Sequence, residues 1–229
     1  MPNLQTIPKK GRLAKPFRQC LVASPGCLLV EADLGSAEAV MLGWFSGDPV
    51  LARVSRLGFH KYLMAKKLGR IVDLNRPDSE LSALFDEVKA SEPGLYDPMK
   101  VAVYASFYLA GASTVFKNNT EVFASEREVK GIQQFMFKEL PGINIYQQGV
   151  VKQKFKWNSQ TRWGWSGNRL INPFGYSAEY WDMAGGDAPA ACAFLPQSTI
   201  GSLMKEAMIQ LWSEEDLETW HASARTNGD

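Results

Sequence analysis

The sequence predicts a mixed fold of the α/β or α+β class, in which a small antiparallel sheet accompanies many helices. Apolar residues 27–30 lead to Asp33 and a turn, and the apolar spacing over residues 37–45 is typical of a helix. Residues 190–212 also suit a helix, interrupted near Pro196. Amphipathic spacing recurs over residues 61–68, 79–89 and 126–140. With 229 residues the chain can bury a core as one domain or as two closely joined subdomains.

The segment that leads to Asp33 predicts a β-hairpin. Residues 20–23 suit a short strand, residues 24–26 (S-P-G) a turn and residues 27–34 a buried strand. An ionised Asp33 at the carboxyl end of that strand needs a cation or a group of donors to offset its desolvation, which favours a metal site. On the residues alone, Asp33 fits equally well as a cap of the helix that follows.

Two Asp-Pro pairs predict the starts of helices. Gly47 suits the position just after a helix, Asp48 suits an N-cap and Pro49 suits the first residue of the next helix. In the same way, we expect Asp97 to cap a helix that begins at Pro98.

The helix expected after Asp97 carries a candidate phosphate site. Lys100, Tyr104 and Tyr108 are four residues apart, so they share one helix face. A lysine close to a helix amino end suits a phosphate, and the two rings below it suit a base or a sugar, so the face fits a nucleoside triphosphate. The alternative is that the tyrosines belong to the core and the lysine extends along them to solvent.

Basic residues are concentrated in two stretches that contain no acid, although the formal net charge is only +1. Residues 1–30 include Lys9 and Arg12, which we consider candidate DNA contacts because such stretches attract polyanions. The second stretch, residues 140–178, includes a tryptophan-bearing segment at 152–165. That segment suits either a surface that follows a nucleic-acid backbone or a hairpin core. Both stretches are also compatible with ordinary solvated surface.

Cysteine spacing and hydropathy indicate a cytoplasmic protein with no membrane partner. Cys20, Cys27 and Cys192 are odd in number and form no zinc motif, so we expect reduced and mostly buried thiols. Prolines interrupt the first twenty residues, unlike a signal sequence. The longest uncharged run, residues 101–116, is shorter than the roughly 20 residues that cross a bilayer.

Four motifs in this order resemble those of A-family, DNA polymerase I-like DNA polymerases, and they extend over nearly the whole chain. They are N-L-Q-T-I-P at residues 3–8, D-L-G-S-A-E at 33–38 with S-G-D at 46–48, K-x-x-x-Y-x-x-x-Y at 100–108, and Q-x-T with K-E-A-M at 197–208. The resemblance implies a palm subdomain over residues 1–48, helical fingers over 49–151 and a further part of the palm over 152–229. It implies an incomplete right-hand fold without the thumb and the last palm strands.

The resemblance also implies roles for individual residues. Asp33 would be one of two metal-binding aspartates, and the carbonyl of Leu34 would help to hold two Mg²⁺ ions that activate the primer 3′-hydroxyl and stabilise pyrophosphate. Glu38 would be the steric gate that favours deoxynucleotides. The other implied roles are triphosphate binding by Lys100, a lesser phosphate contact by His60, packing on the incoming nucleotide by Tyr104, stacking at the template position by Tyr108, and a minor-groove contact by Gln197.

Several residues depart from the family pattern. Tyr96 stands where the family has a phosphate-binding arginine, and Leu109 replaces the glycine that follows the fingers tyrosine. The second catalytic aspartate of the family lies in a His-Asp pair, whereas His221 is followed by Ala222. We therefore expect a fragment of a phage- or plasmid-type polymerase that is inactive by itself.

The expected function is template-directed DNA synthesis by the parent polymerase, a nucleotidyltransferase that acts on primer-template DNA and dNTPs. The alternative is a noncatalytic module that binds nucleic acid with a degenerate polymerase fold. A single-subunit RNA polymerase is disfavoured, because Glu38 and Tyr104 resemble a DNA-type gate.

Overall fold

A computed structural model describes residues 12, 14–28, 33–151, 156–157, 165–166, 168–181 and 186–211. The chain separates into two units, an N-terminal unit of residues 1–35 and a main unit of residues 36–229. The main unit contains most of the helices and both short sheets of the described residues.

The N-terminal unit differs from the expected hairpin. Its one described helix is α1 (Ala14–Gln19), and residues 20–23, expected as a strand, are irregular. Cys27, Leu28, Asp33 and Leu34 also lie outside strands, and residues 29–32 are outside the described part. The prediction of buried thiols was wrong for Cys20 and Cys27, which are exposed, and right for Cys192. Two short strands alone form a hairpin of marginal stability, and the described positions of this segment have no further strand beside them.

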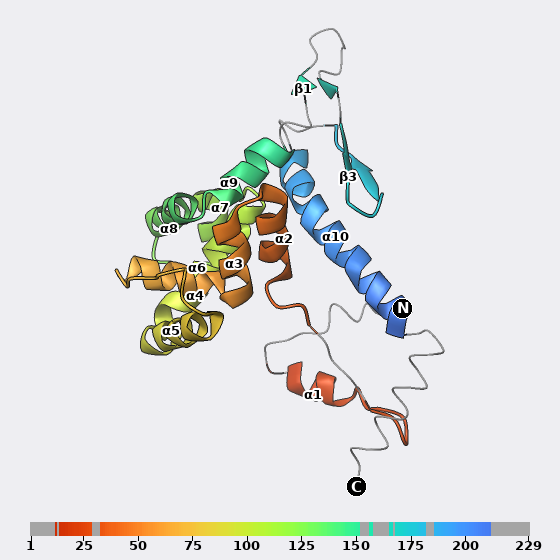
Figure 1. Ribbon diagram of the computed structural model, residues 1–229, viewed down its shortest axis with the longest axis horizontal. Coiled ribbons are helices and arrows are strands. Elements are labelled where there is room, and N and C mark those ends of the chain that lie inside the picture. The colour runs from red at the N-terminus through yellow and green to blue at the C-terminus, as the bar shows by residue number, and fades with distance from the viewer. Residues whose placement is uncertain are drawn as a thin grey trace. The chain divides into compact units, whose positions relative to one another are not determined.

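The main unit is mostly helical. Its helices in chain order are α2 (Ala37–Ser46), α3 (Pro49–Leu57), α4 (Phe59–Lys67), α5 (Asp78–Ser91), α6 (Pro93–Phe107), α7 (Ala112–Lys117), α8 (Glu126–Glu139), α9 (Gly142–Asn144), the π-helix η2 (Ile145–Val151) and α10 (Asp187–Leu211). Figure 1 shows α10 beside α2, with α3 packed on the other side of α2. The helices expected near residues 37–45, 61–68, 79–89 and 126–140 are confirmed.

The described strands form two antiparallel pairs, which keeps the fold in a mixed class. Strands β1 (Lys156–Trp157) and β2 (Trp165–Ser166) place Trp157 opposite Trp165. Strands β3 (Arg169–Ile171) and β4 (Ser177–Glu179) form the second pair. Asn172 fixes the turn of this second hairpin by accepting bonds from two amides of the turn, and its own amide reaches Ser198 and Ser202 of α10.

The core of the main unit is formed by the inner faces of these helices. Its largest fully buried side chains are Tyr146, Phe59, Phe85, Phe107, Leu42, Leu51, Leu63, Met64, Leu81, Met99, Ile132 and Met136. They come from α2 to α6, α8 and η2, so the helices enclose one continuous apolar cluster.

Asp48 joins two helix starts that are far apart in the sequence. Its Oδ1 accepts hydrogen bonds from the amides of Val50 and Leu51 at 2.9 and 3.1 Å, which makes it the expected N-cap of α3. Its Oδ2 accepts a bond of 2.8 Å from the amide of Gly142, at the start of α9. A Cβ at residue 142 would lie 2.4 Å from Oδ2, so this contact requires glycine. Gly47 ends α2 with φ 67°, as predicted.

Two helix boundaries were predicted wrongly. Helix α6 begins at Pro93, so Asp97 does not cap it and Pro98 lies inside the helix. Pro93 already supplies the fixed φ that suits the first residue of a helix. Helix α6 therefore begins about one turn earlier in the sequence than predicted. Helix α10 also continues through Pro196, which is buried, because contacts with α2, η2 and β3 hold both halves in line.

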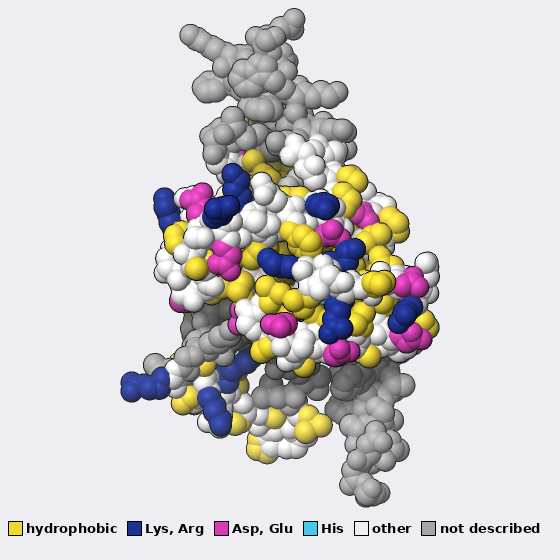
Figure 2. All heavy atoms as spheres, turned by 90° about the vertical axis from the view of Figure 1, so that its left-hand side faces the viewer, with side chains coloured by type: hydrophobic (Ala, Val, Ile, Leu, Met, Phe, Trp, Pro, Cys, Tyr) yellow, Lys and Arg dark blue, Asp and Glu magenta, His cyan; other side chains and the backbone are white. Residues whose placement is uncertain are grey.

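Charged side chains of both signs share the face shown in Figure 2, which presents the side of the molecule seen at the left of Figure 1. Among the described residues, ion pairs join different helices, as in Lys61 with Asp86 at 2.5 Å and Lys66 with Glu139 at 3.3 Å. Opposite charges therefore offset each other in these pairs. In the part of the chain that is described, every helix is too short or too polar to cross a membrane.

Replacement of Asp48 by alanine should lower the free energy of unfolding by about 2 to 4 kcal/mol, because the α3 cap and the charged bond to Gly142 are both lost. Urea denaturation measures this loss. The matched control is Asp97→Ala, which removes an exposed aspartate that caps nothing and should change the free energy by less than about 0.5 kcal/mol. Equal effects of the two variants would contradict the assignment of the cap.

Candidate functional site

Three of the expected site residues meet in the main unit. Gln197 Nε2 donates a hydrogen bond to Glu38 Oε1 at 3.2 Å and another to the Tyr108 hydroxyl at 3.5 Å. The Glu38 carboxylate also lies close enough to the Tyr108 hydroxyl to raise its pKa. Glu38 lies in the first turn of α2, Tyr108 directly follows α6, and Gln197 lies on α10. The fold thus brings together residues that are 159 and 89 positions apart in the sequence.

The protonation of Tyr108 sets the direction of these bonds. Burial raises the pKa of its phenol, and the nearby Glu38 carboxylate raises it further, while the Gln197 amide acts in the opposite direction. Tyr108 is therefore protonated at neutral pH, with its hydroxyl beside the Glu38 carboxylate. The hydrogen bond from Gln197 links Glu38 to α10.

The end of α6 positions Tyr108. The helix ends at Phe107, so Lys100 and Tyr104 lie within α6 and Tyr108 is its C-cap residue. Leu109 has φ 60°, in the left-handed region where glycine is favoured and where leucine costs roughly 1 to 2 kcal/mol. The buried Gln147 offsets this strain by donating to the carbonyls of Ser106 and Phe107 at 2.7 and 3.2 Å.

A second glutamine and a tyrosine complete the support of the site. Gln133 donates to the carbonyl of Ala110 at 2.8 Å and thus fixes the chain after Leu109. Tyr146, adjacent to Gln147, donates to the carbonyl of Cys192 at 2.7 Å, about one turn before Gln197 on α10. The sequence analysis did not predict a role for Gln133, Tyr146 or Gln147. The available signal was limited to Gln147, which follows the apolar residues Ile145 and Tyr146.

Tyr104 and Lys100 lie one and two turns before the end of α6. The Tyr104 ring packs edge-on against Phe59 and Phe107, with centroid distances of 5.7 and 5.6 Å, and lies 5.0 Å from the His60 ring. Tyr104 is half-buried, whereas the Lys100 side chain is exposed. The packing supports the core role that was considered for Tyr104, and the exposed Lys100 leaves a cation available beside it.

His60 is a buried, neutral residue of α4. Its side chain is 5% exposed, and its Nε2 has no hydrogen-bond partner among the described residues. Burial lowers the pKa of His60 to about 3, and the positive charge of Lys100 contributes to this shift. A contact with phosphate would therefore use a neutral imidazole and would require the ring to be uncovered.

The remaining expected residues belong to the N-terminal unit. Asp33 and Leu34 are exposed and irregular in structure, and Arg12 is exposed in a turn. Lys9 lies outside the described residues. Within the described ranges, no group of three His, Cys, Asp or Glu side chains is arranged to hold a metal ion.

Comparisons with known proteins gave no match to this chain among family models, curated proteins or solved structures. The motifs and the geometry of the main unit therefore carry the functional argument.

The neutral His60 should make the protein less stable in acid. Below pH 6.5 the unfolded state binds a proton that the folded state excludes until about pH 3, so stability that is fully present above pH 6.5 is lost as the pH falls. Between pH 6.5 and 4.5 the expected loss from His60 is about 2 to 3 kcal/mol. Urea denaturation across this range measures it.

The control is His60→Leu, which has a similar volume and no titratable group. Carboxylates elsewhere contribute equally to both proteins, so the difference between the two pH profiles isolates His60. Parallel profiles would contradict a buried neutral imidazole.

Proposed function

We propose that this chain is the palm and fingers part of an A-family-like DNA polymerase and serves template-directed transfer of deoxynucleotides to a primer 3′-hydroxyl. The contact of Gln197 with Glu38 and Tyr108 carries this proposal. The motif resemblance assigns these three residues to the nucleotide and the primer-template. Their meeting from three separate helices is what a shared site for the two ligands requires.

Glu38 suits the role of a steric gate because Gln197 restrains it. The Gln197 amide donates to its carboxylate, which favours a position that would meet a ribose 2′-hydroxyl. The Tyr108 hydroxyl accepts from Gln197, and its ring supplies an aromatic surface on which a template base can stack.

Lys100 and Tyr104 suit the triphosphate and the base or sugar of the incoming nucleotide. Lys100 is exposed on α6, and Tyr104 is held by its aromatic neighbours. Since an immobilised ring loses little conformational freedom on binding, this packing favours nucleotide affinity.

Asp33 and the carbonyl of Leu34 would provide the hard oxygen ligands that Mg²⁺ prefers. When bound, two such ions would stabilise the negative charge on the attacking and the leaving oxygen of phosphoryl transfer. The residues of the main unit would bind and orient the incoming deoxynucleotide and exclude ribonucleotides.

Because Gln197 contacts Tyr108, we expect removal of the Gln197 side chain to lower the affinity for primer-template DNA. Gln197→Ala should weaken the binding of a fluorescently labelled primer-template about fivefold, measured by anisotropy, because a polar contact with the duplex is lost. The control is Gln134→Ala, an exposed glutamine on α8, which should bind as the wild type does. Equal affinities of both variants would remove Gln197 from the DNA interface.

In a primer-extension reaction of the complete parent polymerase with Mg²⁺, Asp33→Ala should abolish synthesis, whereas Glu38→Ala should retain synthesis and admit ribonucleotides at least tenfold more readily. The readout is the ratio of ribonucleotide to deoxynucleotide incorporation on a gel. Asp97→Ala is the control, and it should behave as the wild type. Primer-template binding by the complete protein without any Mg²⁺-dependent extension would favour the noncatalytic module instead.

A further inference from the structure

Helix α6 offers one cation toward the proposed triphosphate. Lys100 is the only lysine or arginine between Pro93 and Phe107, and Tyr96 occupies the position one turn before it. A triphosphate carries several negative charges, so a site with one exposed ammonium group would bind it weakly. A second cation has to come from another element.

Lys89 of α5 lies next to this position. Its Nζ is 4.3 Å from the centroid of the Tyr96 ring, on the face of the ring, in a cation–π contact. The Tyr96 ring also meets the His60 ring nearly edge-on, with a centroid distance of 5.9 Å. Lys100 is close enough to His60 to lower its pKa. Lys89 and Lys100 therefore both lie near this pair of rings.

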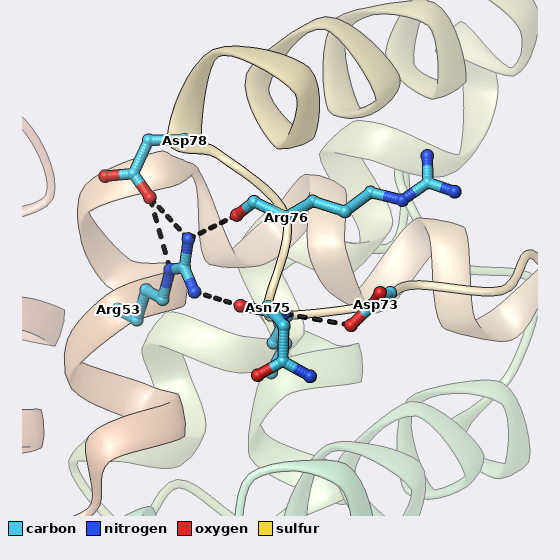
Figure 3. A network of polar contacts seen from close by, with 6 residues as sticks. Arg53, Asp73, Asn75, Arg76 and Asp78 are labelled. Carbon is cyan, nitrogen blue, oxygen red and sulfur yellow. Dashed lines mark hydrogen bonds and ion pairs between the residues drawn. The ribbon is translucent and has the colours of Figure 1, made fainter.

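The start of α5 is anchored by Arg53 of α3, as Figure 3 shows. The Arg53 guanidinium donates to the carbonyls of Leu74 and Arg76 and to the carboxylate of Asp78, the first residue of α5. Arg53 Nη2 lies 2.7 Å from Asp78 Oδ1, so a bond between opposite charges fixes the first turn of α5.

A second contact fixes α5 close to Lys89. Lys61 of α4 donates to Asp86 at 2.5 Å, one turn before Lys89. Because Lys61 already partly neutralises the charge of Asp86, Asp86 attracts the more distant Lys89 less strongly. The Lys89 side chain is exposed, so its ammonium group is accessible to a ligand at the Tyr96 ring.

We propose that Lys89 supplies the second cation of a polyphosphate site, in which Lys89 and Lys100 together bind a triphosphate beside the Tyr96 and His60 rings. This inference rests on the proposed function, since it names the residue that completes the triphosphate subsite. The cation–π contact with Tyr96 restrains the Lys89 ammonium group, which lowers the entropy cost of ordering a long side chain around the ligand.

Titration calorimetry of the 229-residue chain with inorganic tripolyphosphate, and then with dATP, tests the proposal. Lys89→Met should weaken tripolyphosphate binding about fivefold and Lys100→Met about tenfold. Lys130→Met, which removes an exposed lysine of α8, is the matched control and should leave the affinity unchanged. Lys89→Arg keeps the charge and should keep the affinity, and Tyr96→Arg should restore binding in the Lys89→Met background.

The outcomes separate the two proposals. Wild-type affinity in Lys89→Met together with a loss in Lys100→Met would overturn the role of Lys89 and leave the proposed nucleotide site intact. Wild-type affinity in both variants, or no binding by the wild type, would overturn both. Thermal melting of each variant checks the fold, and a Lys89→Arg protein that is folded but binds as poorly as Lys89→Met would also contradict a role for charge.

Discussion

The structure of the main unit depends on one carboxylate, that of Asp48. One of its oxygens caps α3, and the other binds the amide of Gly142 at the start of α9. Because α9 continues directly into η2, this contact sets where η2 begins. Gly142 and Asp48 approach so closely that no side chain is tolerated at position 142. A local capping signal thus also acts as a long-range constraint.

From η2 the constraint extends to the candidate site. The adjacent residues Tyr146 and Gln147 bind the backbone of α10 and the end of α6, respectively. These two helices carry Gln197 and lead to Tyr108, which meet at Glu38. Buried polar side chains that are fully bonded in this way specify one arrangement, because any other leaves carbonyls without partners. The proposed polymerase site therefore depends on polar residues that do not themselves touch a ligand.

The successes and errors of the sequence predictions have different physical causes. Gly47, Asp48 and Pro49 gave the correct helix boundary because capping is a local property of a few residues. Asp97 led to a wrong helix boundary, since Pro93 already starts α6. Pro196 failed to interrupt α10 because tertiary packing offset the loss of one backbone bond.

The sequence by itself determined the helical periodicity, the cap at Asp48 and the residue types of the candidate site, since these follow from short-range spacing and from motifs. Only the tertiary structure decided which of those residues meet. It joined Gln197 to Glu38 across 159 positions, placed Lys89 on the ring of Tyr96, and buried His60 so that it is neutral. Burial and long-range contact arise from how helices pack, and no local pattern specifies which side chains will face each other.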